Sequence, residues 1–494
     1  MVQLRKFKPN AYINLRMLLR TIGWLLMVLT GFMLFPLVTA LIYGDSEIRP
    51  IVISMLITLG SGICLMSLRP RSKDMGKREA IMLTSLIWII LSLFGMLPFL
   101  LCGTHDSVTD AFFETMSGFT TTGASVLDSL QNVPHSLLLW RCLLQWIGGL
   151  GIILFTLAVV PMLNNRGGML MFNEEVTGIT HDKLRPRVSN TAKSLWGIYI
   201  CLTVACILLL WISRMNLFEA ICHGLSTMST GGFSTSDMSI RDWNSPYIII
   251  ILTVFMFIGG VNFNLIFASV YGDWKKLLKN DAFKWFCITI LFGYVVFTIS
   301  IIGKHHVHGW QELTIVPLFQ SVSILTSTGL VVPHFSQWGA VPYVVMLIFM
   351  AVGGCAGSTS GGAKIDRFII FFKFLNNEMY RTMYPSAVKT VTVNGKGTSY
   401  IIVMKVLAFI ALYFLVIFVG GFLLTVLGVD FDDSFYYALS SISNAGMGTE
   451  VQGGGTCFAL LPDAAKWILS FIMLIGRLEL YTILLLFTPA FWKK

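Results

Sequence analysis

Charged side chains are scarce in this chain. Asp, Glu, Lys and Arg supply only 12% of the 494 residues, whereas hydrophobic residues supply 55%. Soluble globular domains carry about 25% charged residues. The shortage excludes a water-soluble globule and indicates an integral membrane protein.

Motifs that carry enzymatic or nucleotide chemistry are also missing from the sequence. It contains no H-E-x-x-H, no G-x-S-x-G, no pair of intramembrane aspartates, no G-x-G-x-x-G followed by an acidic residue and no G-x-x-x-x-G-K-[ST]. We therefore expect that the protein is not an enzyme and that this chain binds no nucleotide. The nine cysteines form no C-x-x-C pair and lie mostly inside apolar runs, so they are interpreted as packing residues.

Long apolar runs, in contrast, are abundant. A helix that crosses a bilayer needs about 20 residues. The sequence predicts ten spans, of which the eighth is interrupted, at 21–44, 51–68, 80–103, 136–163, 194–212, 247–272, 286–303, 340–375, 399–429 and 467–492. They lack the alternating pattern of an outer-membrane barrel. The predicted fold class is an all-α integral membrane protein.

The formal net charge of +10 reports on orientation. Lys and Arg collect before the first span and in the loops after the second, fourth and sixth spans. Positive residues in short loops are retained on the cytoplasmic side of a membrane. This pattern predicts that both termini are cytoplasmic, and it does not indicate nucleic-acid binding.

One polar phrase occurs four times between the spans: "FTTTGASV", "MSTGGFST", "LTSTGLVV" and "ISNAGMGT". Each copy follows an amphipathic segment that is too short and too polar to cross a bilayer. Aligned on one shared glycine, the phrases give these candidate binding residues: Thr121, Thr122, Gly123; Ser229, Thr230, Gly231; Ser327, Thr328, Gly329; Asn444, Ala445, Gly446.

The repeated unit is therefore a span, a half-helix, a glycine loop and a second span. It predicts four pore repeats at 79–190, 191–280, 281–398 and 399–494, with two extra N-terminal helices in residues 1–78.

Irregular backbone at membrane depth is tolerated only where protein buries it or where it lines a water-filled path. Four such loops can meet this condition together if they converge on one axis. Their carbonyl oxygens could then replace the water shell of a cation, and the half-helices would direct the negative ends of their dipoles to the same axis. The threonines would stiffen the loops. The sequence therefore predicts a central cation pore.

The eighth span contains a segment that cannot remain helical. "GGCAGSTSGG" holds five glycines and three hydroxyl residues in ten positions. We expect a loop in the cavity beneath the filter, where it obstructs the path, with Arg477 in the last span paired to its carbonyl groups. The candidate gate residues are Gly353, Gly354, Gly357, Ser358, Thr359, Ser360, Gly361, Gly362 and Arg477.

These loops, together with "QWIGGLGI", "GGCAGSTSGGAKIDR" and "GRLEL", resemble the potassium transporters of the Trk/Ktr/HKT superfamily over nearly the whole chain. The two extra N-terminal helices resemble its bacterial Trk-H branch. The resemblance implies a potassium filter, a gating loop below it, a homodimer and a cytoplasmic, TrkA-like ring of nucleotide-binding regulatory subunits. Glycine at all four filter positions favours K⁺ over Na⁺, and Asn444 with Ala445 makes the fourth loop unlike the others.

Several residues have structural interpretations. Gly148, Gly149 and Gly151 are typical of close helix packing. Glu114 is interpreted as a helix-terminal or hydrogen-bonded structural carboxylate, with attraction of cations as the alternative, and Glu219 stands at a comparable place in the second repeat. His223 is interpreted as a packed polar residue, with a ligand role as the alternative. The histidine-rich "KHHVHGW" at 304–310 is interpreted as a solvated outer loop.

Two wider alternatives remain open. A secondary transporter for another small solute also uses discontinuous helices, although it usually has two inverted halves. The polar loop at 180–193 and the segment Lys373–Lys396 are expected to dock the regulatory partner, with anionic lipid head groups as the alternative contact.

Overall fold

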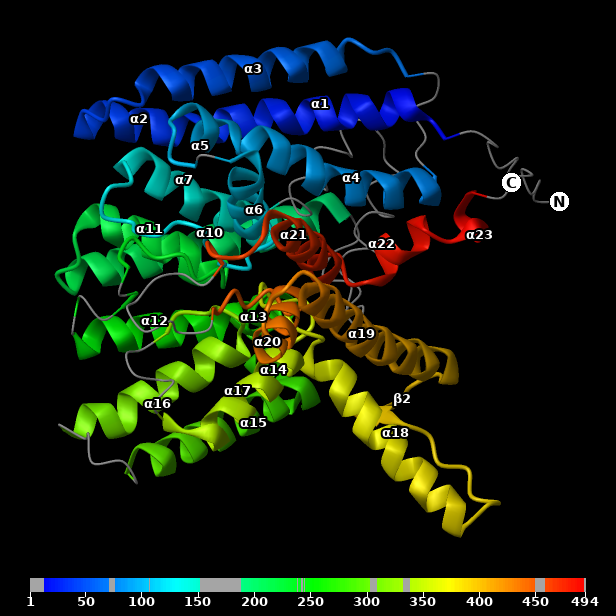
Figure 1. Cartoon of the computed structure of the whole chain (residues 1–494). Helices are drawn as coiled ribbons and strands as arrows, with labels where there is room; N and C mark the ends of the chain where they lie inside the picture. The colour runs from blue at the N-terminus through cyan, green and yellow to red at the C-terminus, as the bar shows by residue number, and fades with distance from the viewer. Residues whose placement is uncertain are drawn as a thin grey trace.

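Helices form almost all of the regular structure (Figure 1). The computed structural model describes residues 13–70, 76–105, 107–151, 188–237, 239–240, 243, 245–302, 309–331, 338–448 and 458–492. In chain order the elements are α1 (Leu15–Phe32), α2 (Leu34–Tyr43), α3 (Ile48–Met66), α4 (Lys77–Gly95), α5 (Leu97–Leu101), α6 (Val108–Phe119), α7 (His135–Trp146), the π-helix η1 (Ile147–Gly151), α10 (Val188–Ile212), α11 (Leu217–Met228), α12 (Pro246–Gly259), α13 (Phe263–Val270), α14 (Trp274–Lys279), α15 (Asp281–Ile302), α16 (Trp310–Leu325), α17 (Ala340–Val352), α18 (Ile365–Met383), β1 (Thr392–Val393), β2 (Lys396–Gly397), α19 (Tyr400–Val426), α20 (Phe431–Ile442), α21 (Asp463–Arg477), α22 (Tyr481–Leu486) and α23 (Pro489–Trp492).

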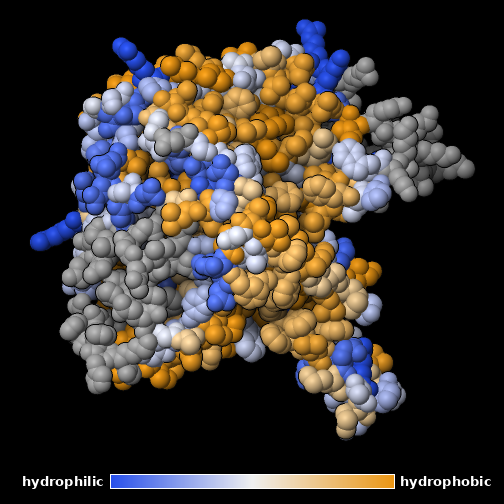
Figure 2. Space-filling model, viewed as in Figure 1, coloured by the Kyte–Doolittle hydropathy of each residue, from blue (hydrophilic) through white to orange (hydrophobic). Residues whose placement is uncertain are grey.

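Within the described part of the chain, six helical segments are long and apolar enough to cross a membrane. They are α1 with α2, α3, α4 with α5, α10, α15 and α19. Hydrophobic residues cover a broad part of the visible surface, and hydrophilic residues gather at the left end and at the tip of the lower projection (Figure 2). The prediction of a helical membrane protein is confirmed.

Four shorter helices, α6, α11, α16 and α20, precede the four glycine loops and have 12, 12, 16 and 12 residues. A 12-residue helix extends about 18 Å, well short of a hydrocarbon core of about 30 Å. These are the predicted half-helices. Figure 1 places α6 and α20 in the middle of the molecule, on either side of α21, and both contact α21.

The helix that follows each glycine loop is irregular in all four repeats, whereas the sequence predicted a break only in the eighth span. The predicted continuous span 247–272 is wrong, because α12 and α13 meet at an angle of 102°. The predicted continuous span 467–492 is also wrong, because α21 ends at Arg477 and α22 begins at Tyr481. In the span predicted at 136–163, α7 passes into η1, and residues 152–163 lie outside the described residues.

The break between α12 and α13 has a clear physical cause. The backbone N–H of Cys355 donates to Gly260 O (3.0 Å), and that of Thr359 donates to Gly259 O (3.2 Å). Both donors belong to the loop that follows α17. Carbonyl groups that a continuous helix would pair internally are thus paired by a segment about a hundred residues away.

Residues 365–398 project from the bundle at the lower right of Figure 1. Helix α18 leads to β1 and β2, which pair antiparallel. The two residues between the strands, Asn394 and Gly395, both have positive φ (52° and 74°), as a two-residue type I′ turn requires.

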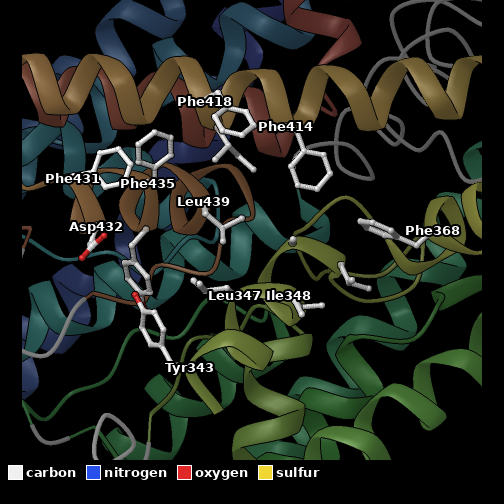
Figure 3. A pocket seen from close by; sticks show the side chains of 14 residues that line it. Tyr343, Leu347, Ile348, Phe368, Phe414, Phe418, Phe431, Asp432, Phe435 and Leu439 are labelled. Carbon is white, nitrogen blue, oxygen red and sulfur yellow. The ribbon is translucent and has the colours of Figure 1, made fainter. Parts of the chain in front are cut away.

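A groove of about 820 Å³ opens between α17, α19 and α20 (Figure 3). Its lining is mostly apolar, with the phenyl rings of Phe414 and Phe418 on α19 facing Leu347 and Ile348 of α17. Asp432 lies at one end of the groove.

Candidate functional site: a ring of four glycine loops

The four half-helices end in the same hydrogen-bond pattern. In the first, Thr121 N donates to Gly118 O (3.0 Å) and Thr122 N donates to Ser117 O (2.8 Å). This is a Schellman motif, which pairs carbonyl groups that the helix end would leave free. Equivalent bonds run to Ser226 and Thr227, to Ser323 and Ile324, and to Ser440 and Ser441 in the other half-helices.

A Schellman motif places one residue in the left-handed region, where glycine is usual. Here that residue is Thr121, Thr230, Ser327 or Asn444, with φ of 54°, 52°, 52° and 49°. A β-branched residue with positive φ is a rare conformation. Its occurrence in two of the four loops indicates that the surrounding structure imposes this backbone.

Two residues further along, each loop has a glycine with positive φ: Gly123, Gly232, Gly329 and Gly446, at 82°, 83°, 76° and 60°. A Cβ on these glycines would collide, in that order, with the carbonyl oxygens of Gly231, Thr328, Ala445 and Thr122. Each glycine therefore lies against the next loop, and the fourth lies against the first. The four loops form a closed ring.

The predicted alignment of the second loop is wrong by one residue. The counterpart of Gly123 is Gly232, because Gly232 has the positive φ and contacts the third loop. Gly231 occupies the position of Thr122. Ser229 is the C-cap of α11, where its hydroxyl donates to Leu225 O (2.9 Å).

A sequence signal for the correct alignment does exist. Each copy reads Ser-x-x-(Thr or Ser)-x-x-Gly, beginning at Ser117, Ser226, Ser323 and Ser440. The middle hydroxyl in all four copies donates to the carbonyl oxygen four residues earlier, at 2.6–2.9 Å. The serine, the middle hydroxyl residue and the glycine are three residues apart in all four copies. An alignment on this spacing selects Gly232 in the second loop.

Gln145 holds the second loop and was not singled out from the sequence. Its Nε2 donates to Gly231 O (2.7 Å), and its Oε1 accepts from Ser226 Oγ (2.8 Å) and from Phe233 N (3.2 Å). The side chain is fully buried. Gln145 therefore links α7 of the first repeat to both sides of the second loop.

Glu114 is a structural carboxylate, as interpreted. It is fully buried and accepts from Arg141 Nε (2.7 Å), Ser125 Oγ (3.0 Å) and Val126 N (2.9 Å). Arg141, which the sequence analysis did not identify, also lies over the ring of Phe233 at 4.2 Å. The pair joins the segments that follow the first and second loops.

The expected equivalence of Glu114 and Glu219 is wrong. Glu114 lies six residues before its cap, Thr120, and the residue six before Ser229 is His223. His223 is fully buried and packs edge-on against Trp243, with ring centroids 4.7 Å apart. Glu219 lies one turn earlier and accepts from Trp243 Nε1 (2.8 Å). Both have packing or hydrogen-bonding roles.

The segment between α17 and α18, residues 353–364, lies directly against the glycine loops and is called the inner loop below. Gly362 N donates to Ser443 O (2.9 Å), and Gly361 N donates to Ser327 Oγ. Ser443 caps α20, and Ser327 is the left-handed residue of the third loop. The inner loop thus contacts the third and fourth glycine loops from the side of the half-helix ends.

Thr359 extends this contact to the second repeat. Its hydroxyl lies within hydrogen-bonding distance of two carbonyl oxygens, Gly259 O at 3.0 Å and Met228 O at 3.2 Å. Met228 is the last residue of α11. Beside it, the hydroxyls of Ser358 and Ser360 are 2.8 Å apart. Most of the candidate gate residues are therefore brought together under the ring.

Arg477 links the inner loop to η1. Its Nη1 donates to Thr359 O (3.1 Å), and its Nη2 donates to the carbonyl groups of Gly148 and Gly149. The two glycines belong to η1, where the irregular helix leaves carbonyls available. Gly148 also packs against the backbone of Phe119, so close packing at this position is confirmed.

Comparison with known proteins places this architecture in a family. A family model described as "TrkH: Cation transport protein" matches residues 49–494. The chain belongs to the TrkH family. The Trk system potassium uptake protein TrkH of Escherichia coli K12 is 38% identical over 488 residues, covering 97% of this chain and all of the relative. TrkI of Halomonas elongata is 32% identical, with 97% of each chain covered.

The fold agrees with that assignment. The crystal structure of the potassium transporter TrkH from Vibrio parahaemolyticus superposes with a TM-score of 0.88 at 34% identity, covering 97% of this chain and all of that one. The resemblance to the Trk/Ktr/HKT superfamily inferred from the loops is confirmed. The TrkH relatives named here are uptake proteins and transporters.

Proposed function

We propose that this chain is the potassium-translocating membrane subunit of a Trk-type uptake system in the bacterial inner membrane. The closed ring of four glycine loops carries the proposal. Four chemically similar loops, each at the C-terminal end of a half-helix, suit a dehydrated monovalent cation better than an organic solute. The names of the TrkH relatives point to K⁺ as the ion.

In this proposal the filter residues are those predicted, with Gly232 added to the second loop. Carbonyl oxygens of Thr122, Gly231, Thr328 and Ala445 and their neighbours replace water around K⁺. The aligned backbone dipoles of α6, α11, α16 and α20 add negative potential at the same place.

The proposed topology has ten spans with both termini in the cytoplasm. It counts α7 with η1, α12 with α13, α17 with α18, and α21 with α22 as spans, in addition to the six long segments. The start of α1 and α23 lie at the same end of the bundle in Figure 1, which supports a common side for the termini. The four repeats keep their proposed boundaries at 79, 191, 281 and 399.

The inner loop is the proposed gate. It lies against three of the four half-helix ends and is held by Arg477 from below. A cation leaving the ring would meet this loop and then a guanidinium group, so that both backbone and charge oppose passage while the loop stays in place.

Regulation is proposed to come from other chains. A TrkA-like, nucleotide-binding ring would dock on the cytoplasmic side, and this chain itself would bind no nucleotide. We also propose a homodimer in which the groove between α17, α19 and α20 faces the second copy. Phe418, which lines this groove, is 62% exposed, and membrane helices associate through close packing of complementary surfaces, which a groove of this kind can offer to a second copy.

Cysteine cross-linking tests the homodimer. Phe418→Cys, in a background with Cys64 and Cys201 changed to Ser, should give a disulfide-linked dimer when membranes are oxidised. Leu56→Cys on α3, which is 63% exposed, is the matched control and should stay monomeric. A monomeric Phe418→Cys protein would move the interface elsewhere and leave the groove to lipid.

Growth rescue tests the function. A bacterium without potassium uptake systems should grow in limiting K⁺ when it expresses this chain with a Trk regulatory subunit. The rescued cells should take up ⁸⁶Rb⁺. Growth failure with correctly inserted protein, together with uptake of another small solute, would favour the secondary-transporter alternative.

A further inference from the structure

We propose that Asn444 is a specificity-determining positioning residue: its side-chain amide clamps the fourth glycine loop to the first and thereby fixes the carbonyl group of Thr122 in the ring. This inference rests on the proposed function, because it assumes that the ring selects a cation. It assigns a role to the residue that makes the fourth loop unlike the other three.

Asn444 uses both hydrogens of its amide. Nδ2 donates to Thr122 Oγ1 (3.0 Å) and to Met473 O (3.0 Å). A main-chain carbonyl can only accept, so the bond to Met473 fixes which end of the amide is nitrogen. The side chain is 1% exposed, and its left-handed backbone suits asparagine better than any other residue except glycine.

The bond to Thr122 continues into a chain with one direction. Thr120 Oγ1 donates to Met116 O (2.7 Å), so the 2.8 Å contact between Thr120 and Thr122 needs the Thr122 hydroxyl as donor. Thr122 Oγ1 is then free to accept from Asn444. The amide, two hydroxyls and a half-helix carbonyl form one polarised series, in which each bond strengthens the next.

This series lies at the contact that closes the ring. Thr122 O faces Gly446 of the fourth loop, and Asn444 lies two residues before that glycine. Thr122 and Asn444 are 322 residues apart in the chain. With its side chain held from both directions, Thr122 has little freedom to rotate its carbonyl group. A filter selects between K⁺ and Na⁺ through the positions of such oxygens.

The other loops provide internal comparisons. Thr328 repeats the hydroxyl contact with Thr326 (2.8 Å), but among the described residues no amide from another loop reaches it. At the position of Asn444, the hydroxyls of Thr230 and Ser327 donate to the preceding carbonyl of their own loop, both at 2.7 Å. The hydroxyl of Thr121 has no partner within the described residues.

The test measures the K⁺/Na⁺ permeability ratio by reversal potential in proteoliposomes. Asn444→Gly removes the amide without backbone strain, and Thr122→Val removes the acceptor without changing shape. We expect each to lower the ratio about three- to tenfold, the range of one net hydrogen bond. Since both remove the same clamp, the double variant should be no worse than the worse single variant.

Two controls separate the clamp from general damage. Thr121→Gly places the same glycine at the equivalent left-handed position, and Thr328→Val removes the equivalent hydroxyl where no inter-loop bond exists. Both residues belong to the proposed filter themselves, so each variant should lower the ratio, but by less than the clamp variant that it matches. If Asn444→Gly is not recovered as folded protein, the comparison of Thr122→Val with Thr328→Val decides.

Three results would overturn the clamp: parent-like ratios in both Asn444→Gly and Thr122→Val, a double variant whose loss is the product of the single losses, or equal losses in Thr122→Val and Thr328→Val. A parent protein that conducts neither K⁺ nor Rb⁺ even with a Trk regulatory subunit present would instead refute the proposed function, and the clamp with it.

Discussion

At the scale of single residues, the ring depends on a backbone that most side chains cannot adopt. Each loop has two left-handed positions, the first held by Thr, Ser or Asn and the second by Gly. The second position also has no room for a Cβ, because a carbonyl group of the next loop lies there. Glycine is therefore required twice over at these four sites, for conformation and for close approach.

Gly231 and Gly232 allow a test within two adjacent residues. Gly232→Ala violates both requirements, because the residue has positive φ and its Cβ would collide with the carbonyl group of Thr328. It should abolish discrimination between Rb⁺ and Na⁺ or abolish uptake. Gly231 lacks a positive φ, and its added Cβ would meet the side chain of Gln145, which can shift. Gly231→Ala should therefore lose less of the discrimination between Rb⁺ and Na⁺ than Gly232→Ala does. ⁸⁶Rb⁺ uptake with Na⁺ competition measures both, and equal losses would contradict the corrected alignment.

The buried ion pair of Glu114 and Arg141 acts on stability. Loss of one partner leaves an uncompensated buried charge, which costs about 3–5 kcal/mol. Glu114→Gln should lower the temperature at which the detergent-solubilised protein aggregates by several degrees. Glu219→Gln is the control, since the glutamine oxygen can still accept from Trp243. A Glu114→Gln protein as stable as this control would show that Arg141 finds other partners.

At the scale of elements, the irregular helices after the glycine loops supply the surroundings that the inner loop needs. The break between α12 and α13 exposes the carbonyls of Gly259 and Gly260 to it, and η1 exposes those of Gly148 and Gly149 to Arg477. An irregular segment at membrane depth must satisfy its own polar groups. Here the N–H groups of the inner loop pair with the carbonyl groups at the break between α12 and α13. This mutual pairing explains why the two breaks occur together.

Removal of Arg477 or of part of the inner loop should open the proposed gate. Arg477→Ala removes the bond from Arg477 to Thr359 O, and deletion of Ser358 to Ser360 shortens the inner loop. Either change should raise K⁺ flux in proteoliposomes that lack the regulator. Arg381→Ala is the control, because Arg381 lies on the projecting α18 and pairs with Glu378. Parent-level flux in both test variants, with correctly folded protein, would reject the gate.

The repeated phrase was sufficient for the architecture, but it was too short to fix the register of the second loop. Hydropathy and the repeated phrase predicted the half-helices, the loops and the break after α17. The structure decided between Gly231 and Gly232 through φ and a neighbouring carbonyl. The Ser-x-x-(Thr or Ser)-x-x-Gly spacing also distinguishes them, but its first serine lies before the short phrases that were aligned. Arg141 was missed because its partners, Glu114 and Phe233, are distant from it in the sequence. Gln145 was missed because its partners lie in another repeat. The bend at Gly260 was missed for the same reason.

At the scale of the whole molecule, the projecting segment is the clearest candidate for contact with a regulator. Lys373 pairs with Asp281 (3.0 Å) and donates to Thr392 O (2.9 Å), so the base of the hairpin is tied to α15. Further out, Arg381 donates to Lys389 O (3.3 Å) and is 39% exposed. A rigid base and a positively charged tip suit a docking surface for another chain or for lipid head groups.

Binding measurements separate the two partners. Arg185, Arg187 and Arg381 changed together to Ala should weaken capture of a soluble nucleotide-binding ring by about 3- to 150-fold, at 0.2–1 kcal/mol for each of three exposed charge pairs. Arg185 and Arg187 lie outside the described residues, so Arg381→Ala alone tests the described surface. Lys275→Ala with Lys276→Ala is the control on a different element, α14. Nanodiscs of neutral lipid keep head-group charge constant during the measurement. Two results together would assign these arginines to the membrane surface: unchanged capture of the ring, and weaker recruitment of anionic lipid by the triple variant. The positive charge would then be neutralised by lipid phosphates and not by a protein partner.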